Sequence, residues 1–196
     1  MDLWAKSFDI TMRPLERGTF RRYREWLVPK TSGSLLEIGS GTGANLPYLP
    51  CGEVKELTLS DVSLHEEALR ERLEGSCFEE AEMVEASTER LPFPDGAFDA
   101  VLATLVFCSV PDHHKGLREV RRVLKPGGRF YFLEHVLPEV NYLAVPMKLA
   151  NPLWKLVADG CHLNRRTAEA IETAGMRIEK LRRDTQGVLI AGWARS

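Results

Sequence analysis

The chain has 196 residues, 44% of them hydrophobic and 28% charged, which are the proportions of a globular domain that can bury a core of its own. The formal net charge of −2 leaves no overall basic surface and argues against nucleic acid as a partner. No apolar run approaches the roughly 20 residues of a spanning helix, and the first residues lack the apolar core of a secretory signal. We therefore expect a cytoplasmic protein with no stable membrane insertion.

The four cysteines are widely spaced, and no two of them form a CxxC pair. This distribution disfavours both a structural zinc site and a disulfide framework. We expect no metal centre and reduced thiols at Cys51, Cys77, Cys108 and Cys161.

Residues 1–30 precede every predicted strand and are rich in aromatic and basic side chains. We expect them to form a helical cover over a cleft. Their arginines are expected to lie on a solvated helix face: Arg17, Arg21, Arg22 and Arg24.

Short apolar runs alternate with segments of helical period through the middle of the chain. Strands are predicted at 34–39, 56–61, 82–87, 98–106 and 129–136, with helices at 64–74 and 114–124. Strand and helix in repetition predict an α/β fold, with a mostly parallel sheet and helices on both faces. Because no repeat, low-complexity tract or flexible linker interrupts the pattern, we expect residues 1–196 to form a single domain.

The last part of the chain departs from this alternation. Asn164 is a candidate cap for a helix that runs to Ala174 and ends at Gly175. The strand-like runs at 176–184 and 187–195 are then separated only by a tight turn. A connection this short allows only an antiparallel pair, so the sheet is expected to end in a hairpin.

The stretch SLLEIGSGTGANLPYL, residues 34–49, places three glycines directly after the first strand. In an open parallel sheet, ligands bind beyond the carboxyl ends of the strands, beside the first strand. Gly39, Gly41 and Gly43 let the backbone turn sharply and approach a ligand that a β-carbon would keep away.

The glycine pattern alone leaves the ligand open. GSGTGA also satisfies the dinucleotide fingerprint GxGxxG/A, so a nicotinamide or flavin nucleotide is one alternative. Glu37, however, would repel a pyrophosphate and attract a cation. Asp61, at the end of the second strand, is placed to accept hydrogen bonds from ribose hydroxyls. Together these two carboxylates favour a nucleoside that carries positive charge.

LLEIGSGTG resembles the first motif of the class I S-adenosylmethionine-dependent methyltransferases. ASTERLPFPDGAFDAVLA and LREVRRVLKPGGRFYF resemble later motifs of that family, in the same order. This resemblance implies S-adenosylmethionine as cofactor and a Rossmann-like sheet of seven strands that ends in an antiparallel hairpin.

A narrower resemblance covers nearly the whole chain. TLVFCSV, FLEHV and DGCHLNRRT are similar to the methyltransferase-like proteins that methylate alkyl thiols, and to bacterial relatives labelled phospholipid or quinone methyltransferases. We expect no apolar N-terminal anchor of the kind that the membrane-bound animal thiol methyltransferases have, which is a departure from their pattern. It also has Ser87 where many class I enzymes have an acid beside the adenine.

The family pattern implies a role for each matching residue. The three glycines approach the methionine part of the cofactor, and Glu37 helps to hold its ammonium group. Asp61 binds the ribose, and Val62 packs on the adenine face. The remaining cofactor residues are Ser87, Thr88 and Glu89 at the adenine edge, and Thr104 beside the methyl donor.

Methyl transfer needs little acid–base chemistry, because holding the acceptor and the methyl at near-attack distance can supply most of the acceleration. Where a base is used, the candidates are His135, just past the fifth strand, and Asp159 or His162 in DGCHL. Residues 137–163 are inserted after that strand, and their apolar side chains are expected to border an acceptor pocket. The implied function is methylation of a small molecule, with a thiol as the first candidate acceptor. A phospholipid amine or a quinone carbon is the alternative acceptor, and a non-catalytic nucleoside-binding module is the alternative from another class.

Overall fold

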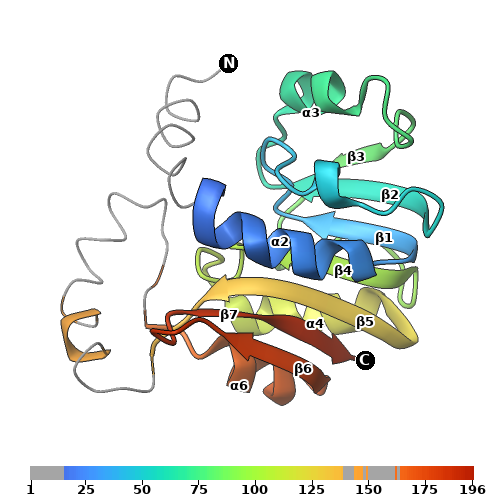
Figure 1. Ribbon diagram of the computed structural model, residues 1–196. Coiled ribbons are helices and arrows are strands. Elements are labelled where there is room, and N and C mark those ends of the chain that lie inside the picture. The colour runs from blue at the N-terminus through green and yellow to red at the C-terminus, as the bar shows by residue number, and fades with distance from the viewer. Residues whose placement is uncertain (1–15, 139–143, 148, 150–161, 163) are drawn as a thin grey trace.

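The computed structural model describes residues 16–138, 144–147, 149, 162 and 164–196. Within these ranges, seven strands form one sheet in the order β3-β2-β1-β4-β5-β7-β6 (Figure 1). Their bounds are Gly33–Ile38 for β1, Val54–Asp61 for β2, Glu82–Glu85 for β3, Phe98–Thr104 for β4, Leu124–His135 for β5, Arg177–Arg183 for β6 and Leu189–Arg195 for β7. The first five strands are parallel, and β7 pairs antiparallel with both β5 and β6. The predicted α/β class, strand number and terminal hairpin are confirmed.

Helices cover both faces of the sheet (Figure 1). They are α2 (Arg21–Leu27), α3 (Glu66–Leu73), α4 (His113–Val123) and α6 (Thr167–Thr173), with short turns η1 (Glu16–Phe20), η2 (Val28–Lys30) and η3 (Leu46–Tyr48). Residues 144–147 and 149 are also helical. No helix in the described part of the chain has both the length and the apolar character needed to cross a membrane.

The two faces of the sheet are built from alternating apolar side chains, as the period of two in a strand requires. The face under α4 and α6 carries Leu36, Ile38, Val101, Phe130 and Phe132. The opposite face, under α2 and α3, carries Leu35, Leu59, Leu102 and Leu133. The sheet is thus buried on both sides, which leaves its edges and the loops at its ends for binding.

One detail of the C-terminal part differs from expectation. Helix α6 starts after Arg166, which is its N-cap residue, so the prediction that Asn164 caps the helix was wrong. The hairpin turn is closed by the side chain of Asp184, whose Oδ1 accepts the N–H of Leu189 at 2.9 Å. An aspartate that bonds backbone groups within its own turn is a common way to hold such a connection.

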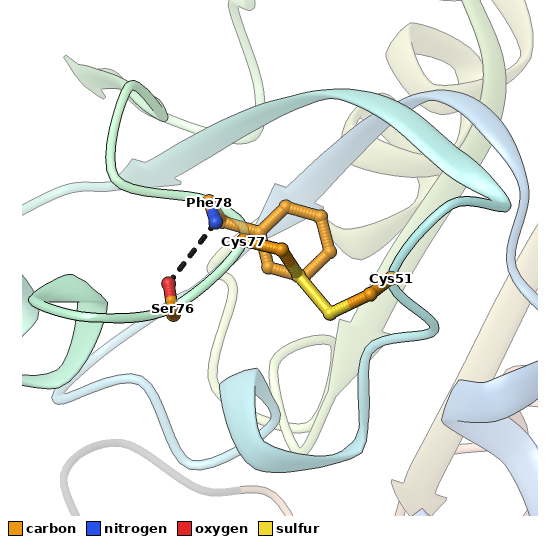
Figure 2. Close-up of a disulfide and its surroundings, with 4 residues drawn as sticks. All are labelled: Cys51, Ser76, Cys77 and Phe78. Carbon is orange, nitrogen blue, oxygen red and sulfur yellow. Dashed lines mark hydrogen bonds between the residues drawn. A yellow bond between two sulfur atoms is a disulfide. The ribbon is translucent and has the colours of Figure 1, made fainter.

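The expectation of reduced thiols was wrong for two cysteines, because Cys51 and Cys77 form a disulfide across a Cα–Cα distance of 6.0 Å (Figure 2). Cys51 precedes β2 and Cys77 precedes β3, and these strands are parallel neighbours. Parallel pairing brings the amino ends of both strands to the same edge of the sheet, and with them the two cysteines. Their separation of 26 residues gives no local sign of this pairing. Cys108 is buried and keeps its thiol, and Cys161 lies outside the described residues.

Candidate functional site

The order in which the chain adds strands to the sheet reverses between β1 and β4. From this pair, the strand order runs outward through β2 and β3 on one side and through β5 on the other. A switch point of this kind leaves a crevice at the carboxyl ends of the two central strands. The loop after Ile38, the end of β2 at Asp61 and the end of β4 at Thr104 all lie at this edge.

The three loop glycines all have positive φ, of 67° at Gly39, 50° at Gly41 and 84° at Gly43. They differ in what surrounds them. A β-carbon on Gly39 would lie 2.4 Å from Val106 Cγ2, and one on Gly43 would lie 2.7 Å from Leu46 Cδ1. A β-carbon on Gly41 would have no atom within 4 Å. At Gly39 and Gly43 a β-carbon would therefore collide with the fold, whereas at Gly41 it would point into open space that a ligand can enter.

A buried polar cluster lies under this loop and joins four elements. Asn45 donates through Nδ2 to Glu37 Oε1 at 2.9 Å and to Thr104 Oγ1 at 3.0 Å. Its Oδ1 accepts from Arg24 Nε of α2 at 2.9 Å. The sequence prediction included Glu37 and Thr104 but missed Asn45, and it placed Arg24 on a solvated face. Arg24 is instead 4% exposed, and the only signal for its role was its place on the apolar side of a short helix.

Glu37 has the electrostatic character of a cation site. It is 1% exposed, and among the described residues its Oε2 has no hydrogen-bond partner. Burial raises its pKa to about 7, a rise that the Asn45 hydrogen bond and the charge of Arg24 partly offset and the charge of Asp61 increases. A buried carboxylate with one unpaired oxygen is stabilised by a positive ligand and destabilised by an anion. The cluster thus fits an ammonium or sulfonium and opposes a diphosphate.

Asp61 and Val62 lie at the end of β2, beside the glycine loop. Asp61 Oδ2 accepts the N–H of Gly41 at 2.9 Å, and its Oδ1 accepts the N–H of Ser63 at 3.1 Å. A carboxylate oxygen accepts more than one hydrogen bond, so Asp61 can bind further donors such as hydroxyls. Val62 is 66% exposed, an apolar surface of the kind that packs against a flat ring.

The predicted adenine edge follows β3 and is anchored to the same strands, since Ala86 N–H donates to Asp61 O at 2.8 Å. Ser87 Oγ accepts the N–H of Glu89 at 3.2 Å, which closes a tight turn. Thr88 is buried and packs near Gly116 of α4, so its side chain faces the fold.

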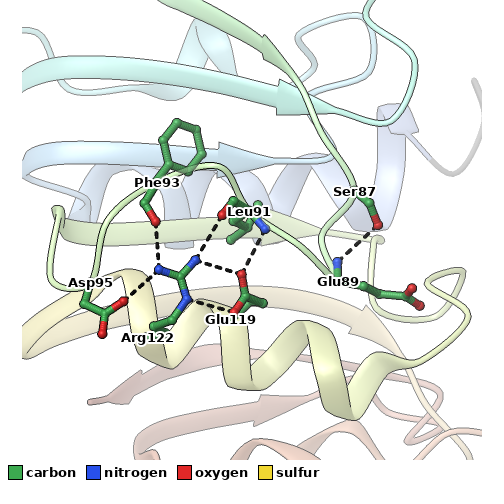
Figure 3. A network of polar contacts seen from close by, with 7 residues as sticks. All are labelled: Ser87, Glu89, Leu91, Phe93, Asp95, Glu119 and Arg122. Atoms are coloured by element: carbon green, nitrogen blue, oxygen red, sulfur yellow. Dashed lines mark hydrogen bonds and ion pairs between the residues drawn. The ribbon is translucent and has the colours of Figure 1, made fainter.

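The segment beyond this turn is held by a clamp of two side chains from α4 (Figure 3). Arg122 donates to the carbonyl oxygens of Leu91 and Phe93 at 3.0 and 2.7 Å. It also pairs with Asp95 and Glu119, each at 2.8 Å. Glu119 Oε2 in turn accepts the N–H of Leu91 at 2.9 Å. Such a planar guanidinium with several oxygen partners fixes the loop in one geometry.

Two of the predicted catalytic residues, His135 and Asp159, have different outcomes. His135 is the last residue of β5, at the same edge as the crevice, and its ring centroid lies 5.7 Å from that of Phe20 in an edge-to-face contact. Its part in catalysis stays a prediction. Asp159 lies outside the described residues, as does most of the predicted insertion at 137–163.

Comparisons with known proteins agree with this geometry. A family model described as a methyltransferase domain matches residues 36–132. The thiol S-methyltransferase TMT1A of Homo sapiens is 36% identical over 178 residues, which cover 89% of this chain and 72% of that protein. The ubiquinone/menaquinone biosynthesis C-methyltransferase UbiE of Francisella philomiragia is 32% identical over 149 residues, 71% of this chain and 59% of that protein.

Solved structures show the same fold. The crystal structure of a SAM-dependent methyltransferase from Aquifex aeolicus superposes with a TM-score of 0.65 at 20% sequence identity, and the match covers 97% of this chain and 96% of that one. The dinucleotide alternative has no support among these relatives, and the unpaired carboxylate of Glu37 opposes it independently. The chain therefore belongs to the class I S-adenosylmethionine-dependent methyltransferases, and S-adenosylmethionine is its methyl donor.

Proposed function

We propose that this enzyme methylates the sulfur of a small apolar thiol. The observation that carries the proposal is the 36% identity to the thiol S-methyltransferase TMT1A, which extends over 89% of this chain and so includes the parts that flank the cofactor motifs. The chemistry that S-adenosylmethionine supplies is an electrophilic methyl on a sulfonium, which becomes the neutral thioether S-adenosylhomocysteine when an acceptor takes the methyl.

In this proposal, Glu37 binds the ammonium group of the cofactor through the oxygen that has no partner in the described structure. The open side of Gly41 receives the methionine part, and Asp61 binds the ribose hydroxyls. Val62 packs on the adenine, and the turn formed by Ser87, Thr88 and Glu89 borders the adenine edge. A cation opposite Glu37 would stabilise the ionised carboxyl, so cofactor binding is expected to release protons near neutral pH.

Thr104 ends β4 beside the methyl donor, where Asn45 fixes its hydroxyl. The acceptor thiol enters from the side of His135 and of the predicted insertion at 137–163. A thiol of pKa about 8.5 is a few per cent thiolate at neutral pH, and this nucleophile attacks the methyl carbon as the methyl–sulfonium bond breaks. The thiol proton passes to solvent or to His135, so no triad of side chains is required.

The experiment is a product analysis. The purified protein is incubated with S-adenosylmethionine that carries a deuterated methyl, together with one acceptor at a time: an alkyl thiol, an aryl thiol, a hydroquinone with a free ring position, or phosphatidylethanolamine vesicles. Mass spectrometry is expected to find the labelled methyl on sulfur, with one S-adenosylhomocysteine per thioether formed. Glu56→Gln, an exposed change on β2, is the matched control and should leave the rate within twofold. Label on a ring carbon or an amine, with none on sulfur, would overturn the thiol assignment.

A quinone carbon is the second candidate, because UbiE is 32% identical over 71% of this chain. Carbon methylation needs removal of a ring or phenolic proton, and it therefore depends more strongly on a base than thiol methylation does. His135→Gln distinguishes the two reactions. Transfer to sulfur should fall by less than about tenfold, whereas transfer to carbon should fall by the 10²- to 10⁴-fold typical of a lost general base.

A further inference from the structure

The segment directly after β4 has an unusual backbone. Leu105 has a φ of 61°, and within the described ranges it is the one residue other than glycine with positive φ. Leucine adopts this conformation at a cost, so its surroundings must hold it there. Part of that support is the N–H of Leu105, which donates to Leu133 O of β5 at 2.6 Å.

The main support is Glu134, the next residue of β5. Its Oε1 accepts the N–H groups of Val106 and Phe107 at 3.0 and 2.9 Å, and its Oε2 accepts the N–H of Cys108 at 3.1 Å. Glu134 is fully buried, at 0% exposed. When Glu134 is ionised, its bonds to three consecutive backbone donors are charge-assisted, and in a low-dielectric site each is stronger than a bond between neutral groups.

The segment that Glu134 fixes contacts the cofactor loop. Val106 Cγ2 occupies the place that a β-carbon of Gly39 would need, 2.4 Å from its ideal position. Thr104, two residues before Val106, belongs to the cluster of Glu37 and Asn45. A displacement of residues 105–108 would therefore move the wall of the crevice nearest the methyl donor, while the groups assigned to ribose and adenine lie on β2 and after β3.

We propose that Glu134 is a positioning residue for methyl transfer, which holds residues 105–108 against Gly39 so that the acceptor and the methyl meet at near-attack distance. The proposal rests on methyl transfer at this crevice, but not on the identity of the acceptor. Glu134 touches neither reactant in this scheme. Because misplacement of reacting groups by about 1 Å can cost a hundredfold in rate, a residue that acts only through a loop can still have a large effect.

The test is Glu134→Gln, which keeps the size of the side chain but places an NH₂ group against one of the three backbone donors. We expect kcat to fall by 10- to 100-fold, while the Kd of S-adenosylhomocysteine, measured by titration calorimetry, changes by less than threefold. The matched control is Asp99→Asn. Asp99 lies near the start of β4 and accepts the N–H of Ser34 at 2.9 Å, at the amino ends of the parallel strands and away from the crevice. The variant should keep kcat within twofold of wild type.

Two further measurements separate this role from general stability and from the choice of acceptor. Val106→Ala leaves every backbone donor to Glu134 in place and shortens only the Val106 side chain that packs against Gly39. We therefore expect kcat to fall by three- to tenfold, while the Kd of S-adenosylhomocysteine stays unchanged. Amide hydrogen exchange needs no acceptor: in Glu134→Gln, Val106, Phe107 and Cys108 should lose at least tenfold protection, and residues of β3 should keep theirs. Unchanged kcat in Val106→Ala, or unchanged protection in a folded Glu134→Gln protein, would overturn the proposal. So would a fall in kcat that is matched by an equal loss of cofactor affinity.

Discussion

Glu37→Gln should remove a pH-dependent loss in the free energy of unfolding, which the wild-type protein shows above neutral pH. Burial raises the pKa of Glu37 from an ordinary value near 4.5 to about 7. The folded state thus holds this proton more tightly than the unfolded chain, and the stability that the proton supplies is complete below pH 4.5 and is lost as the pH rises through 7. Between pH 5.5 and pH 8 the loss is about 2 kcal/mol, since one pKa unit corresponds to about 1.4 kcal/mol.

Urea denaturation of both proteins at the two pH values measures this difference. Glutamine does not titrate, so the free energy of unfolding of the variant, relative to that of wild type, should rise by about 2 kcal/mol when the pH is raised from 5.5 to 8. For a domain of this size, this rise corresponds to roughly 4 to 8 °C in Tm. Burial also raises the pKa of Glu134 to about 7, but this group is common to both proteins and cancels. The exposed change Glu56→Gln should show no such gain. A constant difference between wild type and Glu37→Gln at both pH values would refute the reasoning. At pH 8, calorimetry should also show that the variant binds S-adenosylhomocysteine at least tenfold more weakly.

Four other substitutions test the remaining features. Gly41→Val should raise the Kd of S-adenosylhomocysteine at least a hundredfold in calorimetry, and because Gly41 has a φ of 50° the variant should also lose some Tm. Gly43→Val is strained in the same way and also collides with Leu46, so it should lower Tm further. Tight binding by Gly41→Val would contradict the assignment of the open space. Asp61→Ala should weaken binding by roughly 1.5 to 3 kcal/mol, about 10- to 150-fold, and wild-type affinity would discredit the ribose role. Cys51→Ser removes a disulfide that closes a loop across 26 residues. Without reductant it should lower the free energy of unfolding by up to about 3.5 kcal/mol and leave kcat within twofold of wild type. In dithiothreitol, the difference in the free energy of unfolding between wild type and variant should vanish.

The elements with strong periodicity or distinctive turn chemistry were accessible from the sequence. The β-rich runs around residues 56–61 and 98–106 became β2 and β4 with ends shifted by about two residues, and the tight turn before Leu189 correctly predicted an antiparallel pair. Glu37 was singled out because its charge beside the glycine loop disfavours a pyrophosphate, and Asp61 because it ends the second strand, where ribose hydroxyls could donate to it. Each of these inferences depends on local pattern plus one rule of sheet topology.

The features that escaped prediction are pairings between distant residues. Asn45 looks like an ordinary loop residue until β4 brings Thr104 beside it, 59 positions away. Glu134 stands in an apolar strand, and its three partners are backbone N–H groups, which have no sequence signature. The link between Cys51 and Cys77 follows from the adjacency of β2 and β3, which spacing cannot reveal.

The position of β7 has a consequence for biosynthesis. This strand is made after β6 yet lies between β5 and β6, so β6 cannot join the sheet until residues 189–195 have left the ribosome. Until then, the growing chain presents β5 as an open edge with Phe130, Phe132 and Leu133 in its pairing register. An unpaired apolar strand is a template for association with other chains. A nascent chain stalled before Leu189 should therefore be a strong client for chaperones that bind extended apolar segments, and a chain released just beyond Arg195 should not.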